Sequence, residues 1–144
     1  MTKRIFALML VLVMVFTVVG CESKDDKDAK LEEYKGMIED FLDALTADNY
    51  DKIDKLLYSG LNDEIKPYFE QCEADYGIDY AAGYDLKKYY NAYHMDSEGE
   101  VKGTAYQYDL RVNFGEFESY VTVQILDDGD KAGIVLFEIS PRLV

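Results

Sequence analysis

The sequence predicts an α+β domain in which three helices precede an antiparallel sheet of about four strands. Apolar residues recur at helical spacing from Leu31 to Tyr76, and after Gly77 they recur at every second position. Helices followed by strands, without alternation of the two, are typical of the α+β class. The chain has 144 residues, 49% of them hydrophobic, which suits one folded domain and excludes a wholly disordered chain.

The first twenty residues predict a secretory signal. Lys3 and Arg4 give a positively charged start, and residues 5–20 form a run of sixteen without a charge. A helix of that length spans about 24 Å, whereas the hydrocarbon core of a bilayer needs roughly 30 Å. We therefore expect residues 1–20 to be a signal peptide, and the alternative of an uncleaved signal anchor is disfavoured.

The end of this segment, Val18-Val19-Gly20-Cys21, resembles the lipobox of bacterial lipoproteins. The resemblance implies cleavage after Gly20 and a thioether-linked diacylglycerol on Cys21. Two acyl chains hold a protein on a bilayer stably, whereas one holds it only marginally. The protein would then be lipid-anchored on the outer face of the cytoplasmic membrane, and in a cell with two membranes the sequence does not distinguish the inner from the outer one.

The net charge narrows the range of partners. Without Lys3 and Arg4, 13 basic residues would face 29 acidic ones, a net charge of −16. Nucleic acid is excluded as an expected partner because binding to phosphates depends on cationic side chains. Contact with the bilayer should run through the acyl chains, since anionic headgroups would repel the domain.

After Cys21 the sequence predicts a tether and then the helices. Residues 22–28 contain no apolar side chain, which predicts an acidic solvated linker over 21–30 and a single domain over 31–144. The first helix begins at Leu31, the second is capped by Asp48 or Asn49 and stops near Gly60. The third helix bears Pro67 in its first turn and carries the apolar stripe Ile65, Phe69, Cys72 and Tyr76.

Four strands follow. Residues 86–95 form a tyrosine-rich strand, and residues 106–114 alternate most clearly between apolar and polar side chains. A third strand carries Val121, Val123 and Ile125, and residues 127–130 form a hairpin turn. Residues 132–139 are apolar on both faces, which predicts a strand covered on each side.

The order of these elements resembles the cone-shaped nuclear transport factor 2-like and cystatin-like domains, in particular the small secreted bacterial domains of unknown function. The likeness covers residues 31–139. It rests on an aromatic–aliphatic first helix, a turn before the second helix and a glycine-containing final strand, carried here by Phe41, Leu42, Leu45, Asp48, Tyr50, Gly129, Gly133, Leu136 and Phe137. The resemblance implies a curled sheet around the first helix with a conical cavity, and it implies homodimers formed through the sheet.

Few residues offer catalytic chemistry. His94 and Asp109 are the candidates for an acid–base pair, although Asp109 shares a polar strand face with Arg111. Cys72 is interpreted as a buried hydrophobe because the neighbouring charges are acidic. The acidic run at 127–130 lacks the spacing of a calcium loop. We expect no metal and no cofactor.

Tyrosine is the remaining signal. Eight of the thirteen tyrosines lie between Tyr76 and Tyr108. Tyrosine suits a half-buried strand, and it also suits a pocket because it combines an apolar face with a hydroxyl. If a ligand site exists here, residues 78–85 would form its flap, and the lining would include Tyr84, Tyr89, Tyr90, Tyr93, Tyr106 and Tyr108.

The preferred hypothesis is a lipid-anchored, non-catalytic module that binds a small polar ligand or an envelope protein. The alternative is a small cone-fold isomerase or hydrolase, which requires His94 and Asp109 to project into one cavity. A homodimer through the sheet is a third possibility.

Overall fold

Three α-helices lead into one antiparallel sheet in the computed structural model, which describes residues 24–97 and 99–142. This arrangement confirms the predicted α+β class. The elements are α2 (Lys24–Thr46), α3 (Tyr50–Leu56), α4 (Ile65–Tyr76), the 3₁₀ turn η1 (Tyr80–Ala82), β1 (Tyr84–Asp96), β2 (Thr104–Phe114), β3 (Phe117–Asp127) and β4 (Ala132–Pro141).

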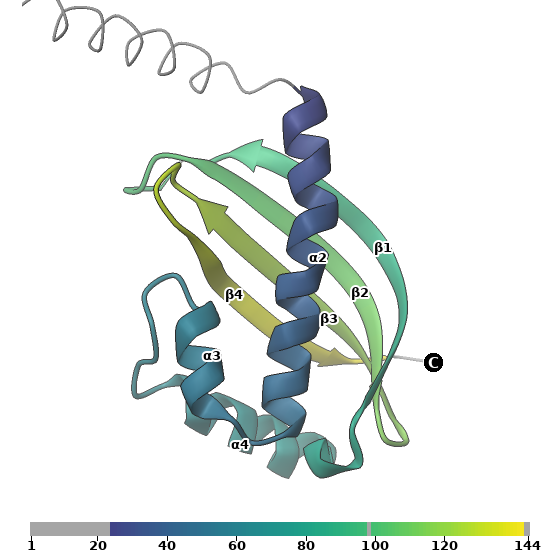
Figure 1. The fold of residues 1–144 in the computed structure, drawn as a ribbon. Helices are drawn as coiled ribbons and strands as arrows, with labels where there is room; N and C mark the ends of the chain where they lie inside the picture. The colour runs from purple at the N-terminus through teal and green to yellow at the C-terminus, as the bar shows by residue number, and fades with distance from the viewer. Residues whose placement is uncertain (1–23, 98, 143–144) are drawn as a thin grey trace, which may run out of the picture.

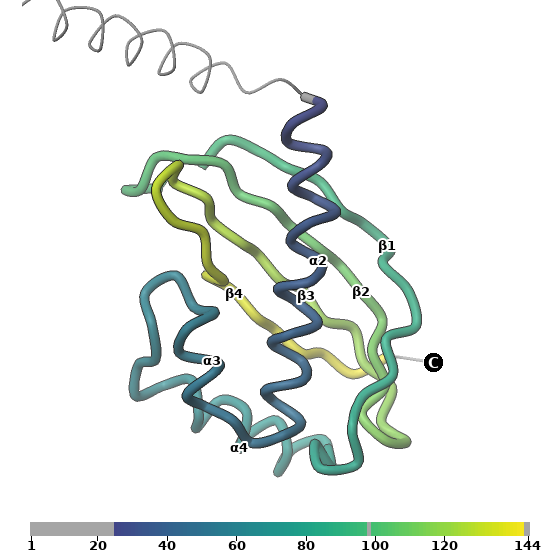
Figure 2. Tube along the Cα trace, viewed as in Figure 1, coloured from purple at the N-terminus to yellow at the C-terminus, as the bar shows by residue number. Residues whose placement is uncertain are grey.

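The sheet is a meander in which neighbours in sequence are also neighbours in space. Its order is β1-β2-β3-β4, and every pair is antiparallel. The strands curl around α2, which crosses the concave face, while α3 and α4 lie together at one end of the sheet (Figure 1). The Cα trace shows that the N-terminus of α2 and the β3–β4 turn lie at the other end of the sheet, away from α3 and α4 (Figure 2).

Alternation along β2 separates a buried face from an outer face. The inward side chains are those of Tyr106, Tyr108, Leu110, Val112 and Phe114, all of which are almost fully buried against α2. The residues between them are partly exposed on the outer face. Burial of apolar surface at roughly 25 cal/mol per Å² is therefore what holds α2 in the concave face.

The start of α2 differs from the prediction. The helix begins at Lys24 and not at Leu31, so the solvated linker expected over 21–30 is wrong for residues 24–30. Asp25 and Asp26 lie in the first turn, where negative charge favours the helix dipole. Residues 21–23 and the predicted signal peptide lie outside the described residues.

Two lysines of this segment connect the start of α2 to the sheet. Lys27 Nζ lies 3.8 Å from a carboxylate oxygen of Asp96 at the end of β1, and Lys30 Nζ lies 3.0 Å from Asp127 at the end of β3. Both side chains are largely covered, so their aliphatic stems pack while their charges are paired. The composition of residues 22–30 does not reveal this, because the stabilising carboxylates come from distant strands.

The ends of the short helices follow the turn residues with one exception. Asn49 caps α3 by accepting a 3.1 Å hydrogen bond from the N–H of Lys52, and Gly77 ends α4 at a φ of 69°. The second helix ends at Leu56, before the predicted Gly60, because Leu57 is extended and bridges to Ile134 of β4.

Residues 78–85 do not form the expected flap. Ile78 is buried in the core, and Tyr80 donates a 3.1 Å hydrogen bond to the carbonyl of Phe69. The segment therefore closes the core below α4, and Tyr84 already belongs to β1.

The last strand, β4, lies at one edge of the sheet. Only its inner face is covered, so the prediction that both faces are covered is wrong. Ile134 and Ile139 are buried on the inner face, but Val135 and Leu136 are 44% and 41% exposed.

Within the described part of the chain, no helix is long and apolar enough to cross a membrane.

Candidate functional site

The sheet separates the two candidate catalytic residues. His94 pairs with the inward Tyr106 and lies on the α2 side, with its Nε2 3.5 Å from a carboxylate oxygen of Asp28. Asp109 lies between the inward Tyr108 and Leu110 and therefore projects from the outer face. Asp109 there accepts hydrogen bonds from the side chains of Asn91 at 3.1 Å and Thr122 at 3.0 Å. His94 and Asp109 thus do not share a cavity.

The six tyrosines proposed as a ligand site are also divided. Tyr106 and Tyr108 are fully buried, and the Tyr108 hydroxyl donates a 2.8 Å hydrogen bond to the carbonyl of Leu31. The hydroxyl of Tyr84 donates a 2.8 Å hydrogen bond to the carboxylate of Asp43. Burial is the largest cause that raises the pKa of Tyr84, and this hydrogen bond is the second. These three side chains hold α2 against the sheet.

Tyr89 packs on the same face, edge-to-face with Tyr108, and its buried hydroxyl has no hydrogen-bond partner among the described residues. Burial raises the pKa of Tyr89 to about 12. Tyr90 and Tyr93, in contrast, are 41% and 42% exposed, with Tyr93 opposite Gln107 on the outer face. The six tyrosines therefore do not surround one pocket.

The outer face carries a small aromatic cluster beside Arg111 and Lys88, whose Nζ lies 5.1 Å from the centroid of the Tyr90 ring. The rings of Tyr90 and Tyr120 lie 5.6 Å apart, and Tyr120 pairs directly with Arg111. The Nε of Arg111 is buried and has no hydrogen-bond partner among the described residues. The cluster lies on the outer face, with the polar side chains of Asp109, Asn113, Thr122 and Glu118 on the neighbouring positions of β2 and β3.

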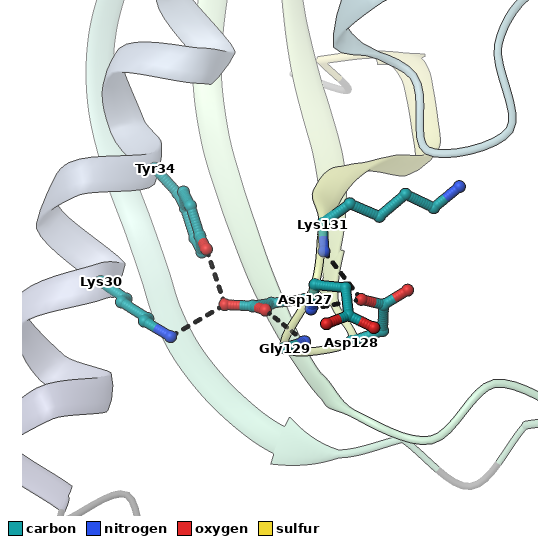
Figure 3. Close-up of polar contacts among 7 residues, drawn as sticks. Lys30, Tyr34, Asp127, Asp128, Gly129 and Lys131 are labelled. Atoms are coloured by element: carbon teal, nitrogen blue, oxygen red, sulfur yellow. Dashed lines mark hydrogen bonds and ion pairs between the residues drawn. The ribbon is translucent and has the colours of Figure 1, made fainter. Parts of the chain in front are cut away.

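The acidic run at the β3–β4 turn is a structural junction. Asp127 accepts hydrogen bonds from Lys30 at 3.0 Å, Tyr34 at 2.7 Å and the N–H of Gly129 at 2.9 Å. Figure 3 shows both α2 side chains pointing at this carboxylate. Burial alone would raise the pKa of Asp127, but the bonds from Tyr34, Gly129 and Lys30 outweigh it and lower the pKa.

Asp128 completes the turn. Its carboxylate accepts 2.8 Å hydrogen bonds from the N–H groups of Asp130 and Lys131, and it also accepts the hydroxyl of Tyr58. Over residues 24–97 and 99–142, no group of three or more histidine, cysteine or acidic side chains is arranged to hold a metal. The turn thus ties α2 and the loop after α3 to the sheet.

A groove lies between β4 and α4, and sequence reasoning missed it. Its volume is about 440 Å³, within the range of ligand pockets. We call it the β4–α4 groove. Its lining residues are Phe41, Leu57, Asn62, Glu64, Ile65, Tyr68, Phe69, Ile134, Val135, Leu136 and Phe137.

Packing from three segments fixes the walls of this groove. Phe137 stacks on Phe41 of α2 with ring centroids 4.4 Å apart, and Phe69 of α4 meets Phe137 at 5.7 Å. At the other end, the N–H of Tyr58 donates a 3.0 Å hydrogen bond to the carbonyl of Ile134. The groove is therefore held open by the core beneath it.

The edge of β4 forms one side of the groove. The N–H of Ile139 points away from β3 and donates a 2.9 Å hydrogen bond to the hydroxyl of Tyr68. Because alternate residues of an antiparallel strand direct their main-chain groups to the same side, those of Phe137 also point outward. Among the described residues, neither main-chain group of Phe137 has a hydrogen-bond partner on that side.

Tyr68 divides the groove from a second hollow of about 480 Å³ further along β4, lined partly by Cys72 and Ile139. Burial is the largest influence on Tyr68 and, together with Cys72 and Glu138, raises its pKa to about 12 against the opposing N–H of Ile139. Burial also raises the pKa of the Cys72 thiol. Cys72 is thus a protonated, buried side chain, in line with its interpretation as a small hydrophobe.

The charges along the two hollows have one sign. Glu64 borders the first, while Asp75 and Glu138 border the second. Among residues 24–97 and 99–142, no lysine, arginine or histidine lines either of them. A guest of positive charge would be attracted to this edge.

The sequence contained one signal that could have indicated the groove. Val135 and Leu136 are adjacent apolar residues in a strand whose inward pattern is carried by Ile134, Phe137 and Ile139. Two consecutive outward apolar residues in an edge strand are unusual unless something covers them.

Comparisons with family models, with curated proteins and with solved structures find no match for this chain.

Proposed function

We propose that this protein is a lipid-anchored, extracytoplasmic binding module without catalytic activity, and that the β4–α4 groove takes an extended, positively charged segment of a partner protein. The observation that carries the proposal is the apolar groove beside an open strand edge. An apolar hollow, free main-chain groups and an acidic border together match the requirements of strand addition.

Main-chain groups of β4 provide the first element of recognition. Phe137 offers one donor and one acceptor, which is the pairing that an added strand uses. Residues 57–58 already pair with Ile134 at the end of the groove. A guest strand would continue along the same edge from that point.

Side-chain burial provides the second element. Successive residues of the guest strand would direct their side chains alternately toward the hollow lined by Ile65 and Phe69 and toward solvent, in the alternation of a strand. Filling the hollow with one aliphatic side chain would contribute about 1.5–3 kcal/mol. A compact small molecule could use the apolar hollow, but it would gain less from the strand edge.

Location and fold enter as parts of the same proposal. The lipobox at Val18–Cys21 supports a diacylglycerol on Cys21 and a place outside the cytoplasmic membrane. The curled sheet around α2 supports the nuclear transport factor 2-like or cystatin-like assignment. The enzyme alternative is disfavoured because its two candidate residues, His94 and Asp109, lie on opposite faces.

Binding of a short peptide of alternating lysine and valine, with blocked ends, tests the groove. Glu64→Lys combined with Glu138→Lys should weaken binding by about tenfold, since like charges would then border the groove at Glu64 and the neighbouring hollow along β4 at Glu138. The matched control combines Glu33→Lys with Glu116→Lys, which changes the net charge equally at exposed sites elsewhere.

Two further peptides separate strand addition from charge attraction alone. A peptide of the same composition with a central proline lacks one main-chain donor and should bind several-fold more weakly. A peptide of glutamate and valine should not bind. Equal binding of the lysine peptide and its proline version, or equal losses in the two double variants, would contradict the proposed site.

A further inference from the structure

The N-terminal end of α2 is held on the sheet by several side-chain contacts. Lys27 pairs with Asp96, and Asp28 lies 3.5 Å from His94, so two consecutive residues of the helix's first turns contact β1. The bonds from Lys30 and Tyr34 to Asp127 add a connection to β3. The helix therefore cannot swing away from the sheet without breaking all of these contacts.

The chain between the proposed lipid and this helix is very short. Lys24 is the third residue after Cys21. An extended chain spans at most about 3.6 Å per residue, so the two Cα atoms are no more than about 11 Å apart. The solvated linker expected over 21–30 would have allowed about three times that distance.

We propose that the domain lies against the bilayer with one end, formed by the first turn of α2, the end of β1 with the β1–β2 connection (95–97 and 99–103) and the β3–β4 turn (128–131). We call it the anchor end. Figures 1 and 2 show these three segments at the same end of the molecule. The inference rests on the proposed function, because it requires the diacylglycerol on Cys21.

The side chains of the anchor end suit neutral lipid headgroups. Met95 and Val101 are exposed apolar residues, and Lys102 and Lys131 are exposed cations. Exposed carboxylates accompany them, namely those of Asp25, Asp26, Asp96, Glu100 and Asp130. Since the carboxylates are in excess, the tether and not headgroup affinity sets the orientation.

In this orientation the β4–α4 groove faces the aqueous space outside the cytoplasmic membrane. The 23 residues of α2 span about 35 Å along the helix axis. The helix α4 and the loop before it lie at the end away from the anchor end (Figure 1). A partner could therefore reach the groove without displacing lipid.

Energy transfer from the acylated full-length protein to a headgroup-labelled lipid in phosphatidylcholine vesicles tests the orientation. One donor dye is placed at Asp130→Cys on the anchor end and, in a second protein, at Glu116→Cys in the β2–β3 turn. Both positions are exposed, whereas Cys72 is buried, and the protein without a new cysteine measures any background labelling. Transfer should be several-fold greater from position 130.

Equal transfer from the two positions, or greater transfer from position 116, overturns the orientation. Insertion of a long glycine–serine segment between Ser23 and Lys24 should reduce the difference, and an unchanged difference would show that the short tether is not its cause. Intact mass distinguishes the two proposals: an acyl group on Cys21 with equal transfer contradicts the orientation alone, whereas its absence overturns the anchor and the orientation together.

Discussion

The hydroxyl of Tyr34 donates a 2.7 Å hydrogen bond to the carboxylate of Asp127 and thereby joins the middle of α2 to the end of β3. Tyr34 is buried against the ring of Tyr106, edge-to-face at 5.1 Å. Burial and the hydrogen bond to Asp127 together raise the pKa of Tyr34. This contact connects α2 to the turn that leads into β4.

Tyr34→Phe should lower the free energy of unfolding by about 1.5–3 kcal/mol, the range for a hydrogen bond to a charged group. The ring and its packing on Tyr106 remain, so the loss measures the hydroxyl alone. Urea unfolding of the chain from Glu22 onward, followed by circular dichroism, provides the measurement. An unchanged midpoint would show that the bond contributes nothing to stability.

Asp127 should make stability depend on acid. The pKa of Asp127 is lower in the folded chain than the usual value near 3.9. Its contribution is therefore complete above about pH 5, and it is lost as the pH falls through the folded-state pKa. The difference in unfolding free energy between the native chain and Asp127→Asn should shrink between about pH 5 and pH 2.

The comparison with Asp127→Asn is needed because protonation of the many other carboxylates relieves repulsion over the same interval. That effect is common to both proteins and cancels in the difference. A difference that stays constant down to the lowest pH at which both fold would contradict the assigned role of Asp127.

The buried tyrosines should limit stability in alkali. Burial is the largest influence on the pKa values of Tyr68 and Tyr89, which are raised to about 12. Burial also raises the pKa values of Tyr80 and Tyr108. The unfolded chain ionises its tyrosines near pH 10. Stability should hence be complete below about pH 10 and decrease as the pH rises further.

Tyrosinate absorbance and far-ultraviolet circular dichroism, recorded together, check this. Exposed tyrosines should titrate first, and the buried ones should ionise only as the circular dichroism signal is lost. One smooth titration of all thirteen tyrosines near pH 10 with an intact dichroism spectrum would contradict the burial described here.

Two glycines should respond in opposite ways to alanine. A Cβ on Gly133 would lie 2.5 Å from the backbone of Tyr58, so Gly133→Ala must push residues 57–58 away from β4. Overpacking of this kind costs typically about 1–3 kcal/mol, and the loss of the groove wall should also weaken binding of the lysine–valine peptide.

Gly36 lies in an exposed turn of α2 with open space around its Cα. Gly36→Ala should stabilise the protein by up to about 1 kcal/mol and leave peptide binding unchanged. Thermal unfolding of both variants measures the contrast. Equal stability changes, or an effect of Gly36→Ala on binding, would contradict the account.

Local patterns predicted most of the fold. The stripe of Ile38, Phe41 and Leu42 and the alternation from Tyr106 to Phe114 each identify a buried face without reference to the rest of the chain. The sequence also predicts the hairpin at 127–130 and the cap at Asn49, because turn and cap preferences depend on a few adjacent residues.

The predictions that failed depend on distant residues. Residues 24–30 form the start of α2, and their lysines Lys27 and Lys30 pair with Asp96 and Asp127 of the sheet, contacts that no local pattern contains. The tyrosines for which the sequence predicts ligand binding lie on both faces of the sheet, which no local pattern reveals either. Composition does not show which tyrosines face α2, nor that β4 and α4 leave a hollow between them.

Hydrogen exchange at the amide of Phe137 tests the central proposal most directly. Its N–H points outward from the edge of β4, where a guest strand would accept its hydrogen bond. Addition of the lysine–valine peptide should slow exchange at Phe137 and leave the amide of Tyr120, in the interior of the sheet, unchanged. Unaltered exchange at Phe137 with the peptide fully bound would contradict strand addition at this edge.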